Sequence, residues 1–560
     1  MSKLRLLLAA VLLASLASAK EITVTLLATT DVHGNIYPVD YFSGQPAERG
    51  LAKIATLIRA ARQENPNSLL IDCGDSIEGT PLESLYQRYV NTGRLPEGLQ
   101  PGAGLAHDPM MLAMNQLGYR AMVMGNHEFN FGLKSIERAR ADAHFPWLSA
   151  NTQVQPGARL KPFAPYIVEK VAGVKIAVIG VTPAGIPIWE QPDHYAGCTF
   201  VDGRDAVAQA VAKLQRKEKP DIIVAAVHEG FSNSPQNLVR RVAMVPGIDA
   251  IVFGHSHQQE PGAHVGNVLL VQPKNWGISL ARIDFKLEQE GRRWKITSKN
   301  SRLIPVTKET EADPAILAIA RPYHELTEKY LDMPVAESPV DMDGTLGRVE
   351  DSPLVDAIQQ VQMFYAKADV SFTALFNTRV RVPKGPVTVR QIAALYVYDN
   401  ELFAIEGNGK MVKDALENAA RYYQTCPDAA CSHGPLINTR VIGYNYDMAE
   451  GVEYEIDLTK PAGQRIVNLR RNGKPLDPNE PLRIAVNNYR AGGSGGYQMF
   501  RDAKVLWRSP HDLRSLIVEY FADHKTLPAR ADGNWRVLPP GALKVLEKEA
   551  AAEASRNVDR

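Results

Sequence analysis

The sequence is best understood from residues 124–132, which read Met124-Gly125-Asn126-His127-Glu128-Phe129-Asn130-Phe131-Gly132. The apolar run 121–124 predicts a short buried strand, and an amide and an imidazole side chain follow it. Other apolar runs before residue 260 also end in potential metal ligands: 23–30 before Asp31 and His33, 68–71 before Asp75, 221–227 before His228, and 251–253 before His255 and His257. Because ligands gather at the carboxyl ends of strands in open α/β sheets, we predict one metal-bearing edge of one sheet.

The candidate ligands are two carboxylates, one amide and four imidazoles: Asp31, His33, Asp75, Asn126, His228, His255 and His257. Oxygen and nitrogen donors without sulfur favour Mn²⁺, Zn²⁺ or Fe. Two neighbouring cations repel each other unless a carboxylate bridges them, and Asp75 is the natural bridge. Two-metal sites of this kind clamp the attacking and leaving oxygens of a displacement at phosphorus. We therefore expect two divalent metal ions as cofactors.

These residues resemble the ordered motifs of the calcineurin-like metallophosphoesterases. The motifs are Asp31-Val32-His33, Gly74-Asp75, Gly125-Asn126-His127-Glu128, His228 and Gly254-His255-Ser256-His257. The resemblance implies that one metal binds Asp31, His33, Asp75 and His257, and that the other binds Asp75, Asn126, His228 and His255. It also implies that His127 is not a ligand but stabilises charge on the transferred phosphoryl group or protonates the leaving oxygen. His127 and Asn126 are the expected catalytic residues.

Nearly the whole chain after residue 19 resembles the exported 5′-nucleotidase family, in which a C-terminal domain binds the nucleotide. Several stretches look most like its bacterial 2′,3′-cyclic-nucleotide 2′-phosphodiesterase/3′-nucleotidase branch: 28–33 with Asp40-Tyr41-Phe42, 125–132, 384–389, 396–400 and 487–491. Two features depart from the 5′-nucleotidase pattern. Asn130 stands where that pattern pairs an Asp with the catalytic His, and Gly493-Ser494-Gly495-Gly496 stands where it reads Gly-Gly-Asp-Gly. Both replace a carboxylate by a neutral group, which indicates a differently held ribose.

The resemblance implies an exported dimetal phosphoesterase that opens 2′,3′-cyclic nucleotides to 3′-nucleotides and then releases nucleoside and phosphate. The alternative with the same metal site is a 5′-nucleotidase or UDP-sugar hydrolase. A third relative, the dimanganese thiosulfohydrolase of sulfur oxidation, shares the site pattern but acts on a protein-bound cysteine conjugate. A non-catalytic nucleotide-binding protein on the same fold is the hypothesis of another class. The expected partner is a small-molecule nucleotide, and we expect a monomer.

Candidate substrate contacts lie in the second half of the chain. By position in the resemblance, Tyr489 is one half of a clamp that stacks on the base, and Tyr446 or Tyr444 is the other half. Asn377, Arg379 and Arg381 follow a predicted strand and are candidates to meet the phosphate or base, since Arg binds phosphate through two parallel hydrogen bonds.

The chain of 560 residues is too long for one hydrophobic core, so at least two domains are expected. Strand-like runs alternate with helix-period segments, which favours an α/β fold. With the resemblance, this implies an N-terminal layered sandwich of mixed β-sheets flanked by helices and a second α/β nucleotide-binding domain. The expected divisions are a signal peptide (1–19), the metallophosphoesterase domain (20–312), a helical linker (313–345), the C-terminal domain (346–543) and a helical or disordered tail (544–560).

Residues 1–19 have the pattern of a secretory signal peptide, since Lys3 and Arg5 precede an apolar run and Ala17-Ser18-Ala19 offers a cleavage site. Export to the periplasm or medium without a membrane anchor is therefore expected. Removal of the segment changes the formal charge from +1 to −1, which gives no support for nucleic-acid or membrane binding. Of the four cysteines, Cys426 and Cys431 are favoured as a disulfide, and a second bridge between Cys73 and Cys198 stays open.

Overall fold

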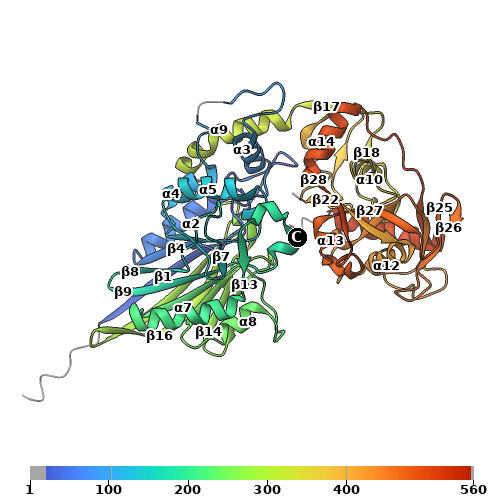
Figure 1. The fold of residues 1–560 in the computed structure, drawn as a ribbon. Coiled ribbons are helices and arrows are strands. Elements are labelled where there is room, and N and C mark those ends of the chain that lie inside the picture. Colours follow the sequence, from blue (N-terminus) through green and yellow to red (C-terminus); the bar gives the residue numbers. More distant parts are fainter. Residues whose placement is uncertain (1–19, 102–103, 399, 556–560) are drawn as a thin grey trace, which may run out of the picture. The chain divides into compact units, whose positions relative to one another are not determined.

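Contacts within the chain divide this computed structural model, which describes residues 20–101, 104–398 and 400–555, into two units (Figure 1). The first unit extends to Thr327 without residues Asp40–Gln45, which group with the second unit. The second unit begins at Glu328, inside helix α9 (Pro314–Leu331). Helix α9 contains Pro322 and fills the first part of the stretch expected to be a linker.

The first unit contains two six-stranded sheets, ordered β16-β15-β1-β4-β5-β6 and β13-β14-β12-β11-β9-β8. The first sheet consists of β1 (Glu21–Thr29), β4 (Ser68–Asp72), β5 (Ala121–Val123), β6 (Trp147–Leu148), β15 (Ser279–Glu290) and β16 (Arg293–Pro305). The second consists of β8 (Tyr166–Val171), β9 (Val174–Val181), β11 (Ile222–Val227), β12 (Ala250–Phe253), β13 (Glu260–Val265) and β14 (Val268–Gln272). Both contain parallel and antiparallel pairs, which confirms mixed sheets.

Strand β11 shows how the apolar runs form this architecture. All six of its residues are buried. Ile222, Val224 and Ala226 face a core that they share with residues of the first sheet, whereas Ile223, Ala225 and Val227 pack with residues of α7 and α8. A strand covered on both faces needs a continuous apolar run, because successive side chains point to opposite faces.

The helices of the first unit are α2 (Leu51–Glu64), α3 (Pro81–Thr92), α4 (Pro109–Leu117), α5 (Gly132–Asp142), α6 (Ile186–Trp189), α7 (Gly203–Lys217), α8 (Leu238–Ala243) and most of α9. Local sequence sets their ends. Helix α4 begins with Asp108 as the cap, whose side chain accepts the N–H of Met111, and ends at Gly118 in the left-handed conformation. Short strands complete this part of the chain: β2 (Val39–Asp40), β3 (Gln45–Pro46), β7 (Thr152–Val154) and β10 (Cys198–Phe200).

The second unit is a separate α/β body. Its five-stranded sheet has the order β23 (Asp447–Glu450), β19 (Val370–Ala374), β27 (Pro481–Asn487), β22 (Glu401–Asn408) and β28 (Val505–Asp512). A four-stranded sheet consists of β26 (Lys474–Pro475), β25 (Ile466–Arg471), β24 (Glu453–Asp457) and β29 (Trp535–Leu538). Two short pairs join β17 (Pro334–Ser338) to β21 (Gly385–Thr388) and β18 (Met342–Asp343) to β20 (Arg381–Val382). The helices are α10 (Pro353–Ala366), α11 (Val389–Ala393), α12 (Gly409–Ala419), α13 (Asn488–Ala491), α14 (Leu513–His524) and α15 (Pro540–Ser555).

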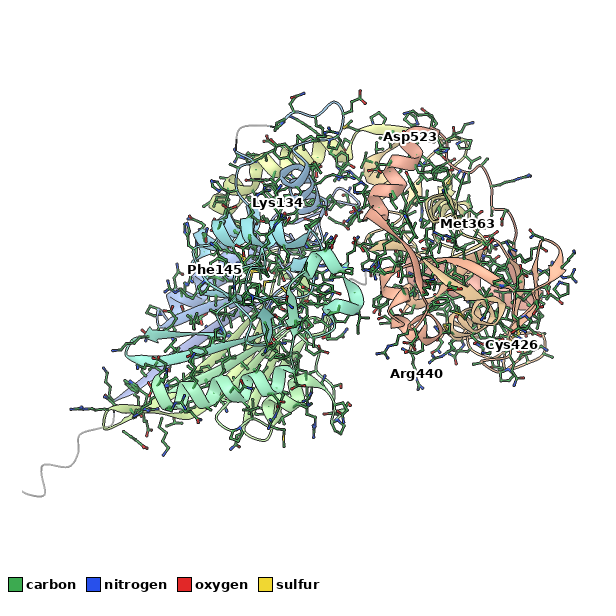
Figure 2. The ribbon with its side chains drawn as sticks, in the orientation of Figure 1. Lys134, Phe145, Met363, Cys426, Arg440 and Asp523 are labelled. Atoms are coloured by element: carbon green, nitrogen blue, oxygen red, sulfur yellow. A yellow bond between two sulfur atoms is a disulfide. The ribbon has the colours of Figure 1, made fainter. Side chains whose placement is uncertain are left out.

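The structure bears on three expectations, of which the first changes. The metal-bearing residues follow strands of two packed sheets and not one, because the first unit is a sandwich. Cys426, labelled in Figure 2, forms the expected disulfide with Cys431, whereas Cys73 and Cys198 are free and buried. The expected tail is helical through Ser555, and Leu546 in α15 is fully buried in the core of the second unit.

The proposed signal peptide lies outside the described residues. Within the described part of the chain, no helix combines the length and apolar character that a bilayer crossing requires.

Candidate metal centre

The candidate ligands meet because neighbouring parallel strands end together in each sheet. In the first sheet β1, β4 and β5 are adjacent and parallel, and in the second sheet β11 and β12 are. The loops after these strands carry the ligand-type side chains: Asp31 and His33, Asp75, Asn126, His228, and His255 and His257. The sandwich brings both sets of loops to one place, as the contacts between their side chains show.

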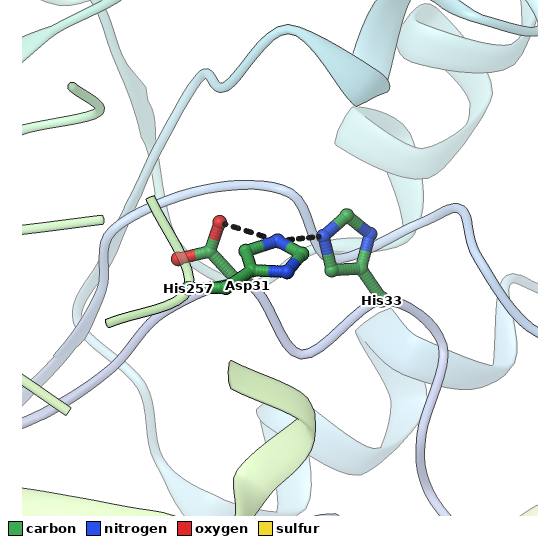
Figure 3. A group of neighbouring side chains, drawn as sticks. All are labelled: Asp31, His33 and His257. Carbon is green, nitrogen blue, oxygen red and sulfur yellow. Dashed lines mark hydrogen bonds and ion pairs between the residues drawn. The ribbon is translucent and has the colours of Figure 1, made fainter. Parts of the chain in front are cut away.

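Two clusters of donor atoms lie within this site. Asp31, His33 and His257 form the first cluster, in which one ligand atom from each lies within 4.8 Å of the others (Figure 3). His257 Nε2 is 3.5 Å from Asp31 Oδ1 and 3.1 Å from His33 Nε2. Asp31 and His33 come from the loop after β1 and His257 comes from the loop after β12, so two loops bring their donor atoms to a common point.

The second cluster consists of Asp75, His228 and His255, with the same 4.8 Å limit between ligand atoms. Asn126 joins it, because its Oδ1 lies 2.9 Å from His255 Nδ1. All seven residues that the sequence singled out as candidate ligands therefore lie at this site.

Asp75 stands between the two clusters. Its Oδ1 accepts the backbone N–H of His127 at 2.9 Å. Its Oδ2 lies 2.8 Å from His228 Nε2 in the second cluster and 3.9 Å from His33 Nε2 in the first. One carboxylate oxygen thus faces both clusters, which is the geometry that a bridging ligand needs.

The backbone of these loops is held in a sparsely populated conformation. Five candidate ligands have positive φ angles between 49° and 68°: Asp31, His33, Asp75, His255 and His257. For residues other than glycine this conformation is unfavourable and is commonly found at functional sites. A Cβ at Gly125 would lie 2.1 Å from Asp75 Oδ1, and one at Gly254 would lie 2.7 Å from Asp31 Oδ2. Glycine is therefore required where these loops pass the carboxylates.

The buried imidazoles of the second cluster differ in protonation. Burial lowers the pKa of His228, but the charge of Asp75 outweighs it and raises the pKa to about 10. His228 Nδ1 donates to the carbonyl of Cys73 at 2.6 Å, so Nε2 is the nitrogen that faces Asp75. This Nε2 is buried and has no hydrogen-bond partner among the described residues. The two facing atoms both carry lone pairs and need a positive charge, which a proton or a metal ion can supply. Burial and the neighbouring His228 lower the pKa of His255 to about 4, so its imidazole is neutral at pH 7, as a ligand must be.

His127 lies beside the clusters, at the start of a short 3₁₀ helix (His127–Phe129). Its Nδ1 is 2.7 Å from Asn130 Oδ1 and 3.1 Å from Glu78 Oε2. Burial opposes the charged imidazole, but Glu78 and Asp75 outweigh it and raise the pKa of His127 well above its usual value. A positively charged imidazole beside the metal clusters can donate a proton to a leaving oxygen or stabilise a developing negative charge.

Two buried carboxylates at this site did not stand out in the sequence as separate candidates. Glu78 contacts His127 as described above, and Glu128 accepts backbone N–H groups from the loops of Asp75 and Gly125. The sequence offered one signal that could have identified them, namely their closeness to predicted site residues. Glu78 follows Asp75 by three residues, and Glu128 follows His127 directly.

The candidate base-stacking tyrosines of the second unit differ in exposure. Tyr489 is 36% exposed, whereas Tyr446 is 1% exposed. The ring of Tyr446 stacks on Tyr422 at 4.8 Å, and its hydroxyl bonds to Tyr423. Tyr446 therefore belongs to the core of the second unit, and this burial contradicts its expected role in a base clamp.

Tyr398 is an exposed tyrosine that was not among the predicted substrate contacts. It is 40% exposed, and its ring lies 6.3 Å from that of Tyr444 and 5.1 Å from that of Phe376. The sequence could have indicated Tyr398 as a substrate contact, because it lies within 396–400, one of the stretches that resemble the cyclic-nucleotide branch. Arg490 supports this surface, since it pairs with buried Asp447 at 2.7 Å and its guanidinium carbon lies 5.3 Å from the Tyr489 ring centroid.

Of the three polar candidates of the second unit, Asn377 and Arg379 lie in the loop after β19, and Arg381 begins strand β20. Arg381 pairs with Asp343 at 2.9 Å and bonds to Thr345. Asn377 Oδ1 accepts the backbone N–H of Arg379 and so shapes the turn. Arg379 is exposed, and none of the ion pairs among the described residues involves its guanidinium. Arg379 is therefore better placed than Arg381 to meet an anionic ligand.

Comparison with known proteins agrees with this organisation. Residues 24–259 match the family described as Calcineurin-like phosphoesterase, and residues 334–502 match the family described as 5′-nucleotidase, C-terminal domain. The chain is 31% identical to the 2′,3′-cyclic-nucleotide 2′-phosphodiesterase/3′-nucleotidase of Salmonella typhimurium, with 95% of this chain and 91% of that protein covered. It is 28% identical to the trifunctional nucleotide phosphoesterase protein YfkN of Bacillus subtilis, and it spans 39% of YfkN. A 5′-nucleotidase precursor from Thermus thermophilus superposes with a TM-score of 0.65 at 25% identity, over 92% of this chain and 99% of that one.

Proposed function

Because this chain belongs to the calcineurin-like metallophosphoesterases that carry a 5′-nucleotidase C-terminal domain, it is a phosphate-ester hydrolase, and we propose that its substrates are 2′,3′-cyclic nucleotides and the 3′-nucleotides formed from them. The observation that carries a two-metal reaction is the placement of Asp75 Oδ2 toward both donor clusters. The relatives of the cyclic-nucleotide branch and the neutral Asn130 support this substrate choice over 5′-nucleotides.

Two divalent ions fit the donor set described above. Asp31, His33, Asp75 and His257 would hold one ion, and Asp75, Asn126, His228 and His255 would hold the other. When bound, these ions supply Lewis acidity that activates water and neutralises charge on the phosphoryl oxygens.

The protein side chains then serve the two hydrolytic steps. In the first, water adds to phosphorus, the bond from phosphorus to the ribose 2′ oxygen breaks, and a proton goes to that oxygen. In the second, water adds again, the bond to the 3′ oxygen breaks, and nucleoside and inorganic phosphate leave. His127 is the proton donor in both steps, because its Nδ1 is bonded to Glu78 and Asn130 and its Nε2 is left for the leaving oxygen.

In the second unit, Tyr398 and Tyr489 form the base-binding surface. Both rings are more than one-third exposed, and stacking of a base on an aromatic ring contributes about 1 to 3 kcal/mol. Tyr444 borders this surface through its contact with Tyr398. Arg379 is the cation that meets the phosphate or the base.

A 5′-nucleotidase activity at the same metal site is the second candidate, and the similarity to the 5′-nucleotidase precursor favours it. A hydrolysis panel decides between the two. Protein loaded with Mn²⁺ is offered 2′,3′-cyclic AMP, 3′-AMP and 5′-AMP, and released phosphate and nucleoside are measured. We expect turnover of the first two and a lower kcat/KM for 5′-AMP, whereas the reverse preference would replace our proposal by the second candidate.

Export is part of the proposal, since residues 1–19 carry the signal-peptide pattern. Mass spectrometry of protein recovered from the periplasm or medium of the expressing bacterium should give a mature chain that begins at Lys20. A chain that keeps Met1 and stays in the cytoplasm would contradict export.

A further inference from the structure

Glu78 connects two functional histidines in the first unit. Its side chain is 2% exposed, and a single oxygen, Oε2, lies 3.2 Å from His33 Nδ1 and 3.1 Å from His127 Nδ1. His33 belongs to the first donor cluster, and His127 is the proposed proton donor. The two imidazole rings meet edge to face, with centroids 5.1 Å apart. One carboxylate oxygen therefore contacts both a metal-site histidine and the proposed acid.

The surroundings of His127 show why this contact matters. At the position where the 5′-nucleotidase pattern places an aspartate, this chain has Asn130, whose Oδ1 is 2.7 Å from His127 Nδ1. The amide nitrogen of Asn130 donates to buried Glu190 at 3.0 Å, which fixes the direction of the amide. Asn130 thus presents a neutral oxygen to His127. Glu78 supplies the negatively charged oxygen, and hydrogen bonds to a charged acceptor are the stronger ones.

The ion pairs of Glu78 are confined to these histidines. In the described part of the chain, its ion-pair partners are His33 and His127. Its loop is also held against His33, because a Cβ at Gly79 would lie 2.6 Å from His33 Cβ. These contacts leave Glu78 Oε2 fixed between the two rings.

We propose that Glu78 is the positioning residue of the proton donor: it holds Nδ1 of His127, takes the place of the aspartate that Asn130 replaces, and ties His127 to His33. This inference rests on the proposed role of His127. By accepting from Nδ1, Glu78 turns the Nε2–H of His127 toward the leaving oxygen. Glu78 also accepts from Nδ1 of His33, so Nε2 of His33 is free to bind a metal. Carboxylates commonly orient metal-binding histidines in this way.

The test uses Glu78→Gln in the full-length chain, because glutamine keeps an acceptor oxygen of similar size but removes the charge. The substrates are aryl phosphates that run from 4-nitrophenyl phosphate, a good leaving group, to phenyl phosphate, a poor one. We expect kcat on phenyl phosphate to fall roughly 10- to 100-fold, as for other residues that orient a functional side chain, and kcat on 4-nitrophenyl phosphate to fall much less. KM should stay within about twofold, since substrate binding is not the affected step.

Rescue provides a readout that a purely structural role would not give. Glu78→Gln combined with Asn130→Asp and Glu190→Gln returns a carboxylate to Nδ1 of His127 from the other side. The change at Glu190 is needed because Asn130 now donates to that carboxylate at 3.0 Å, and an aspartate would be repelled by it. This triple variant should recover most of the lost kcat on phenyl phosphate. The matched control is Glu169→Gln, which removes a carboxylate that pairs with exposed Arg120 at 2.9 Å. This control should leave the aryl phosphate series unchanged.

Metal content and leaving-group dependence together separate the outcomes. Bound metal is measured in every variant by inductively coupled plasma mass spectrometry. Three results would each overturn the role of Glu78: an equal loss on all aryl phosphates, a loss fully explained by missing metal, or the absence of rescue in the triple variant. Failure of the wild-type chain on cyclic and 3′-nucleotides, with the aryl phosphate pattern intact, would overturn only the proposed substrate class.

Discussion

Glu128 Oε2 accepts the backbone N–H of Gly125 at 2.7 Å, and the same oxygen accepts the N–H of Asp75 at 3.0 Å. The second oxygen, Oε1, accepts the N–H of Ser76 at 2.7 Å. Glu128 is fully buried. One carboxylate therefore joins the loop of the bridging aspartate to the loop of Asn126, and it fixes the spacing of two candidate ligands that are far apart in sequence.

Glu128→Ala should weaken metal binding, because three buried N–H groups would lose their acceptor and both loops would relax. Residues that hold metal ligands in place through hydrogen bonds typically contribute about 10- to 100-fold to metal affinity, so we expect a loss of metal affinity of about this size. Titration of metal-free protein with Mn²⁺ in a calorimeter measures it. Unchanged affinity in a correctly folded variant would mean that Glu128 does not hold the ligands in place.

His127→Ala should reduce kcat by roughly 10² to 10⁴-fold, the range for the loss of a general acid or charge stabiliser. Metal content should stay at the wild-type level, because His127 lies outside both donor clusters. Steady-state kinetics on 3′-AMP combined with metal analysis of the same sample provide the check. A deficit that disappears on addition of excess Mn²⁺ would instead make His127 a ligand.

Tyr398→Ala and Tyr489→Ala should each raise KM for nucleotides about 5- to 150-fold, from the loss of about 1 to 3 kcal/mol of stacking. Phenyl phosphate, which has no base, should be hydrolysed as by the wild type. Phe364→Ala is the matched control, because Phe364 is 55% exposed in α10 and packs in a different aromatic cluster with Tyr520 and His524. If all three variants raised KM equally, the loss of any exposed aromatic ring would explain the effect, and Tyr398 and Tyr489 would not form a base-binding site.

Asp356 should make the stability of the second unit depend on pH. Burial, followed by the charges of Asp351 and Asp532, raises the pKa of Asp356 to about 8 from its usual value of 3.8. The folded state therefore holds a proton that the unfolded state releases between these two pH values. The contribution of Asp356 to stability is thus largest below pH 3.8 and falls until about pH 8.

Asp356→Asn removes the charge and keeps an oxygen that can accept the backbone N–H of Asp532. The variant should have a higher Tm than the wild type at pH 8, by about 2 °C or more, and a smaller difference at pH 5. Thermal unfolding followed by circular dichroism at both pH values tests this. A Tm difference that is the same at pH 5 and pH 8 would contradict the expected titration.

The sequence alone located the candidate metal site, because the ligand-type residues lie at fixed places in local patterns. A buried parallel strand needs an apolar run, and the loop after its carboxyl end begins where that run stops, as at Val227 before His228. Strands were predictable for the same reason: the apolar runs 121–124 and 221–227 form β5 (Ala121–Val123) and β11 (Ile222–Val227). The Cys426–Cys431 bridge followed from short separation within one loop.

Only the tertiary structure showed which side chains contact these candidate ligands and which tyrosines of the second unit are buried. The sequence does not distinguish buried Tyr446 from exposed Tyr398, because both are tyrosines in loop segments and only packing against Tyr422 and Tyr423 covers the former. It likewise does not show that Glu78 reaches His33 and His127, since those contacts join three separate loops. Local pattern fixes where a strand ends, whereas the burial and direction of a loop side chain depend on contacts with segments that are distant in sequence.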